Sequence, residues 1–147
     1  MTMYRLISEI QLKHLKEGIT INPAASIQSI EAFERKIGFR LPEDFIEFYS
    51  VCNGFECEEH MFNVKKLEEI TDFQVDYGSN WFHFSDYLVS SDFWSLRVFE
   101  NRYEIFNVAD VEIILTSSLK EFLERYLKGD IFEPEGLYYW HEEIRLK

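Results

Sequence analysis

Residues 30–54 read IEAFERKIGFRLPEDFIEFYSVCNG, in which two apolar helical stripes are separated by Gly38 and Pro42. Apolar residues recur at three- and four-residue spacings on both sides of this break, which predicts helices over residues 24–37 and 43–52. Gly38 can end the first helix in a left-handed conformation, and Pro42, followed by two acids, can begin the second. The stretch therefore predicts two helices joined by a short connection.

The dipeptides that flank these helices agree with this prediction. Asn22-Pro23 can open the first helix, because proline is tolerated in a first helical turn. Asn53-Gly54 is a turn signal that can end the second helix.

Further helices are predicted at both ends of the chain. Residues 4–16 place an apolar face along one side, and Ser118 with Glu121 forms a capping box before a helix over residues 119–128, which Gly129 can close. A weaker pattern predicts a short helix over residues 64–70, capped by Asn63. The face of the first of these helices consists of Leu6, Ile7, Ile10, His14 and Leu15.

The pattern between residues 80 and 116 is typical of strands. Short aromatic or β-branched runs occupy residues 81–84, 93–99, 103–108 and 111–115. The second run alternates apolar and polar residues, which is the period of a half-buried strand. Because the connections are short, we expect antiparallel pairing. The order of elements predicts an α+β fold, with helices packed on an antiparallel or mixed sheet.

Composition and charge limit the classes of partner. The chain has 147 residues, 46% of them hydrophobic, so we expect one folded domain. Its formal net charge is −12, which opposes direct binding of nucleic acid and docking on anionic membranes. No apolar run is long enough for a transmembrane helix, and the N-terminus does not resemble a signal peptide, so we expect a cytoplasmic protein. A basic protein is the natural electrostatic complement.

A search for catalytic and cofactor motifs finds no candidate. Glycine-rich phosphate loops and the Gly-x-Ser-x-Gly elbow are absent from the sequence. Cys52, Cys57 and His60 have the best spacing for a metal, but a second ligand pair is missing, and we expect both thiols to be buried and unreactive. We therefore predict no catalytic residues, no cofactor and no metal site.

The remaining polar and aromatic features have ordinary structural explanations. We expect His14, His60, His83 and His141 to be structural or surface residues, and paired acids such as Glu58-Glu59 to be solvated. An aromatic cluster could be a ligand platform, but a sheet face packed on helices is the better interpretation. The cluster consists of Trp81, Phe82, Phe84, Tyr87, Phe93 and Trp94.

Residues 30–54 also resemble the SUKH superfamily, the domain of the Smi/Knr-type cell-wall regulators. The shared pattern is an apolar-x-x-x-Glu helix, a glycine, Leu-Pro-x-acid-aromatic, and then Asn-Gly. Residues 113–123 look like the closing strand and helix of that family. The resemblance implies the SUKH fold, with a mixed set of strands between these segments.

The resemblance does not cover the whole chain equally. It is clearest over residues 20–128, and residues 129–147 form a C-terminal extension; we expect a single domain over 1–147. Many members carry a glycine-rich acidic hairpin in the middle of the domain, whereas residues 85–90 here contain no glycine. This departure leaves the subfamily, and hence the partner, open.

The resemblance implies a function that does not use catalysis. Bacterial and viral members are similar to immunity proteins, which bind and neutralise a cognate toxin, often a nuclease. Residues 55–100 contain 10 acids and 3 bases, and such a surface would be attracted to a basic toxin. We therefore predict a partner-binding surface formed by Glu56, Glu58, Glu59, Asp72, Asp76, Asp86 and Asp92.

Two alternatives remain open from the sequence. The first is a regulatory protein-interaction module with a non-toxin partner, as the resemblance to fungal members implies. The second is an enzyme of unrecognised type, for which His60 and His83 would be the residues to test. The oligomeric state stays undetermined.

Overall fold

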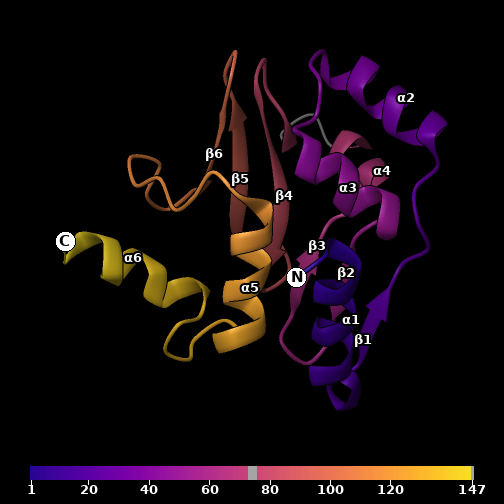
Figure 1. The fold of residues 1–147 in the computed structure, drawn as a ribbon. Coiled ribbons are helices and arrows are strands. Elements are labelled where there is room, and N and C mark those ends of the chain that lie inside the picture. The colour runs from indigo at the N-terminus through magenta and orange to yellow at the C-terminus, as the bar shows by residue number, and fades with distance from the viewer. Residues whose placement is uncertain (73–75, 147) are drawn as a thin grey trace.

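The structure is a computed structural model, and it describes residues 1–72 and 76–146. Its elements in chain order are α1 (Met3–Lys13), a 3-10 helix η1 (Leu15–Glu17), β1 (Ile19–Ile21), α2 (Ile27–Ile37), α3 (Glu43–Val51), β2 (Phe55–Cys57), β3 (Phe62–Val64), α4 (Leu67–Asp72), β4 (Trp81–Tyr87), β5 (Asp92–Val98), β6 (Tyr103–Asn107), α5 (Leu119–Gly129) and α6 (Leu137–Arg145). Within the described residues the strands form one antiparallel sheet in the order β1-β2-β3-β4-β5-β6 (Figure 1). The predicted α+β class is confirmed.

The two central helices form as predicted, with one shift at the start of α2. Gly38 ends α2 with φ 87°, and α3 begins directly after Pro42. Helix α2 starts at Ile27, three residues later than expected, because Ser26 is its N-cap and accepts a hydrogen bond from the Ser29 N–H. Pro23 lies instead in an extended segment, where its carbonyl accepts from the Asn53 N–H at 3.0 Å.

The outer helices differ from expectation at their ends. Helix α1 stops at Lys13, and Leu15 enters η1 with its side chain exposed rather than on the apolar face. Gly129 is the last residue of α5, and the residue with a positive φ at this helix end is Asp130, at φ 51° and ψ −135°. Gly129 is required for another reason: a Cβ there would lie 2.2 Å from the backbone nitrogen of Gly136.

The predicted short helix forms as α4, but Asn63 is not its cap. It begins at Leu67, whose N–H donates to Oδ1 of Asn53 at 3.0 Å. Asn63, the expected cap, lies on β3 and faces Asp86 of β4. A remote side chain therefore caps the helix, which local sequence patterns cannot reveal.

The strand predictions are confirmed for β4, β5 and β6 and wrong for residues 111–115. Residues 111–112 form a turn and residues 113–115 belong to no strand. The Leu115 N–H donates to the Ile105 carbonyl oxygen, next to an isolated bridge between Ile105 and Thr116. Strands β1, β2 and β3 were missed because each is three residues long, which is too short to show a period of two.

The helices cover one face of the sheet and supply an aromatic core. Phe45 of α3 contacts Phe84 of β4 edge-to-face, with ring centroids 5.3 Å apart. Phe122 of α5 contacts Phe84 at 5.0 Å and Trp94 of β5 at 5.9 Å. Phe82, Phe84 and Trp94 are fully buried, which supports the core interpretation of the aromatic cluster for these three rings. Helix α1 packs against both α3 and α5 on this side (Figure 1).

The opposite face of the sheet carries polar side chains and the aromatic rings of Trp81 and Phe93. His83 of β4 stacks on Phe93 of β5 with ring centroids 4.4 Å apart, and its ring is tilted against that of Trp81 at 5.1 Å. Lys65 lies over the Phe93 ring, and its Nζ is 2.7 Å from the Asp76 carboxylate. Ring stacking, a cation–π contact and an ion pair thus connect the side chains on this face.

Candidate functional site

Two neighbouring hairpins enclose a hollow lined by acidic side chains. The hairpins are β2–β3 and β4–β5, which lie side by side because β3 pairs with β4. The hollow has a volume of about 350 Å³, and none of its described lining residues is basic. We call it the acidic hollow; its acids are Glu56, Glu58, Glu69 and Asp86, and its apolar rim is Met61 and Val89.

The strand register places two of these acids across one asparagine. Asn63 of β3 is opposite Glu56 on β2 and opposite Asp86 on β4. Asp86 is also buried, with 6% of its surface exposed, and it accepts hydrogen bonds from the Asn63 amide at 3.0 Å and the Ser90 hydroxyl at 3.1 Å. Glu56 and Glu58 make no side-chain hydrogen bond or ion pair within the described part of the chain, so their carboxylates remain available.

Glu69 enters the hollow from α4, and the charges around it shift the pKa of its carboxyl group. Burial raises the pKa of its carboxyl, Lys66 lowers that pKa, and the negative charges of Glu56 and Asp86 raise it further. A cation in the hollow would relieve this repulsion. Glu69 was not among the residues chosen from the sequence, because its place beside β2 depends on the remote cap of α4.

The other predicted acids lie outside the hollow. Asp76 is only 2% exposed and paired with Lys65, so the expectation that it belongs to an accessible surface is wrong. Asp92 is half-buried and accepts from the Asn107 amide at 2.8 Å and from the Tyr138 hydroxyl. Asp72 is exposed at the end of α4, and Glu59 is exposed beside a different hollow. The structure thus brings together Glu56, Glu58 and Asp86 from the seven acids.

The turn at the tip of β4–β5 has an unusual backbone. Leu88, Val89 and Ser90 have φ values of 56°, 51° and 64°, although none is glycine. Left-handed conformations of this kind cost on the order of 1 kcal/mol or more per residue, and they are rarest for β-branched side chains. Val89 is also 83% exposed. The tip therefore presents an apolar side chain beside the acidic hollow at a cost in backbone energy.

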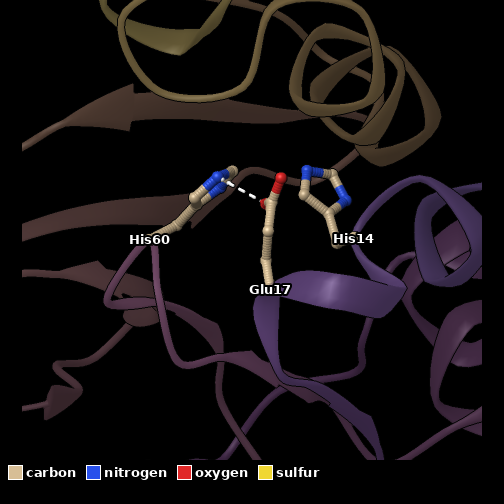
Figure 2. Close-up of side chains that lie close together, drawn as sticks. All are labelled: His14, Glu17 and His60. Atoms are coloured by element: carbon tan, nitrogen blue, oxygen red, sulfur yellow. Dashed lines mark ion pairs between the residues drawn. The ribbon is translucent and has the colours of Figure 1, made fainter.

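A second group of polar side chains gathers where α1 ends. His14 is fully buried, Glu17 belongs to η1, and His60 lies between β2 and β3. Figure 2 shows the Glu17 carboxylate standing between the two imidazole rings, and one of its oxygens lies 2.6 Å from Nε2 of His60. Nε2 of His14 lies 2.8 Å from Asp130 at the end of α5. We call these four residues the histidine cluster.

The sequence did not predict the histidine cluster. His14 and His60 were expected to be structural or surface residues, and they are far apart in the chain. Their approach follows from the pairing of β1 with β2, which matches Ile19 to Cys57. Since β1 was not predicted, no pattern in the sequence could have joined the two histidines.

The cysteines form no site with His60. Both thiols are free and buried, as expected. Burial raises the pKa of Cys52 to about 12 and also raises the pKa of Cys57, so both remain protonated at neutral pH.

The sequence also matches a known protein family. The model of the SMI1 / KNR4 family (SUKH-1) matches residues 24–112, which is more than half of the chain. The matched range runs from the segment before α2 through β6, and it includes both hairpins of the acidic hollow. No curated protein matches the sequence. Among the helices that the structure describes, none has the length and apolar character to cross a membrane.

Proposed function

Because this chain belongs to the SMI1 / KNR4 family (SUKH-1), we propose that it is a non-enzymatic immunity protein that binds and neutralises a cognate protein toxin. The family includes immunity proteins, and its domains are generally non-enzymatic. The toxin would carry a basic surface, as nucleases do to hold phosphates.

The observation that supports this proposal best is the acidic hollow. Four carboxylates line it without a basic residue among the described lining, so lysine or arginine side chains of a partner would be its complement. Met61 and Val89 supply exposed apolar contacts at its rim, and an interface core needs such contacts. Binding there would cover basic groups that the toxin uses on its own substrate.

A capture experiment with matched variants tests the proposal. The hollow variant combines Glu56→Gln, Glu58→Gln and Glu69→Gln, which removes three charges from the acidic hollow. The control variant, Glu112→Gln, Glu124→Gln and Glu142→Gln, removes three exposed charges elsewhere. Wild type and control should capture the same basic protein from host lysate. The hollow variant should associate with it at least tenfold more slowly at low salt.

Neutralisation needs a second readout. The captured protein is expressed alone and with each variant, and growth is measured. We expect growth arrest that wild type and control relieve and the hollow variant relieves poorly. Equal relief by all three would contradict the acidic hollow as the binding site. A specific partner that is harmless when expressed alone would support the alternative, a regulatory interaction module.

A further inference from the structure

The histidine cluster joins three separate segments of the fold around one small volume. His14 follows α1, Glu17 lies in η1, His60 comes from the β2–β3 turn, and Asp130 follows α5. We propose that the cluster binds a divalent transition-metal ion, with Zn²⁺ as the best match to its donors. This site is separate from the acidic hollow and does not depend on the proposed toxin binding.

The outer hydrogen bonds of both histidines are arranged as in metal sites. Nδ1 of His14 lies 2.9 Å from the Ile10 carbonyl oxygen, and Nδ1 of His60 lies 3.0 Å from the Tyr126 hydroxyl. Such second contacts orient imidazole ligands and fix which nitrogen faces the ion. Both Nε2 atoms therefore point inward, toward the carboxylates of Asp130 and Glu17.

The contacts of His14 require a positive species between its ring and Asp130. A carbonyl oxygen only accepts hydrogen bonds, so Nδ1 of His14 must carry a proton. In the neutral ring Nε2 then has a lone pair, and it faces an Asp130 oxygen 2.8 Å away. Two lone pairs repel at this distance. Either a second proton or a metal ion must lie between these two atoms, and a Zn²⁺ titration separates these two occupants.

The donor set favours zinc over the hard cations. Two imidazole nitrogens with carboxylate oxygens suit Zn²⁺, whereas Mg²⁺ and Ca²⁺ take oxygen ligands. The ligand atoms of His14, Glu17 and His60 lie within 4.8 Å of one another. Bonds of about 2.1 Å place tetrahedral ligands roughly 3.4 Å apart, so shifts of about 1 Å in the side chains bring these three ligand atoms to one ion.

An ion can reach the cluster from solvent, and the Lys13 ammonium group that competes with it for Asp130 can move away. His60 and Asp130 both line a hollow of about 260 Å³. Nζ of Lys13 lies 3.1 Å from Asp130 and also donates to the Leu127 carbonyl oxygen. Its side chain is 37% exposed, so a metal ion that binds Asp130 can displace it toward solvent. The bound ion would link the end of α1, the β2–β3 turn and the end of α5, which is a structural role.

The test uses the untagged full chain after treatment with a chelator. Zn²⁺ is titrated by calorimetry, and Co²⁺ is titrated by its visible absorption, which is intense for four-coordinate sites with nitrogen ligands. We expect one ion per chain and a rise in melting temperature at saturating Zn²⁺. Glu17→Gln and His60→Ala should each weaken Zn²⁺ binding at least tenfold. Tyr126→Phe should weaken it about tenfold through the ring of His60.

Matched controls keep the result interpretable. Glu112→Gln removes an exposed charge away from the cluster, and His141→Ala removes a histidine on α6; neither should change the affinity. Circular dichroism checks that each variant is folded. Absence of saturable binding, or equal affinity in Glu17→Gln, His60→Ala and the controls, would overturn the proposal. Either result would assign the cluster to hydrogen bonds between each imidazole ring and its carboxylate, without a metal ion.

Discussion

Glu34 is the polar exception on the apolar stripe of α2, and the structure gives it a specific partner. Its Oε2 accepts a hydrogen bond from the backbone N–H of Leu41 at 2.7 Å, just before α3 begins. The contact connects the two central helices across their loop. A single carboxylate therefore fixes the geometry that the sequence suggested only through Gly38 and Pro42.

Removal of this carboxylate should destabilise the fold. In Glu34→Ala the buried Leu41 N–H loses its acceptor, and we expect a loss of about 1–3 kcal/mol in the free energy of unfolding. Urea denaturation measures the change. Glu31→Ala, an exposed residue one turn earlier, is the control and should change stability by less than about 0.5 kcal/mol.

His83 predicts a pH dependence of stability. Burial lowers the pKa of the His83 imidazole and is the largest effect on it. The Asp76 carboxylate partly opposes this shift, and the Lys65 charge adds to it. The unfolded chain therefore binds this proton more readily than the folded chain, so stability falls as pH drops below about 6.5. His83→Gln should reduce the loss of stability between pH 7.5 and 5.5. An unchanged pH profile in urea denaturation would show that His83 contributes nothing to it.

At the level of elements, the ends of helices decide where the chain turns. Gly38 separates α2 from α3 at φ 87°, and a Cβ placed there would meet no atom within 4 Å. Any cost of substitution is thus due to backbone conformation and not to a clash.

Gly38→Ala should lower the free energy of unfolding by about 1 kcal/mol, because L-residues disfavour the left-handed region. Gly38→Asn should cost less, since asparagine tolerates that conformation. The two variants are compared by thermal and urea unfolding. Equal losses, or no loss, would contradict a conformational origin.

Elements with caps and a full period were predictable from the sequence, and short or remotely fixed elements were not. Residues 43–52 and 119–128 carry both signals, and α3 and α5 match them closely. The three residues of β1 carry neither. The candidate site shows the same limit of prediction from sequence. The density of acidic residues indicated Glu56 and Asp76 equally, but in the folded chain Asp76 is buried and paired with Lys65.

At the level of the whole molecule, α6 extends the core beyond the family match. Leu137 and Trp140 are buried, and Arg125 of α5 lies over the Trp140 ring. The helix returns to α5 through a loop whose ends, Gly129 and Gly136, touch backbone to backbone. The C-terminal extension is thus anchored by close packing.

Gly136→Ala should therefore disturb the whole molecule. Its Cβ would lie 2.2 Å from the Gly129 carbonyl oxygen, so the loop must shift, at a cost of about 1–3 kcal/mol. We expect a lower melting temperature in a single unfolding transition. A separate early transition of α6, followed by tryptophan fluorescence, would instead show that the helix is independent of the core.

The neighbour-to-neighbour order of the sheet sets a sequence of events for folding. Strands β2 to β6 can pair by closing connections between adjacent elements, and loop closure is least costly when few residues intervene. Strand β1 is the exception, because residues 22–54, with α2 and α3, separate it from β2. It should join last on folding and open first on unfolding. In amide hydrogen exchange, we expect Thr20 in β1 to exchange before Leu96 in the centre of β5.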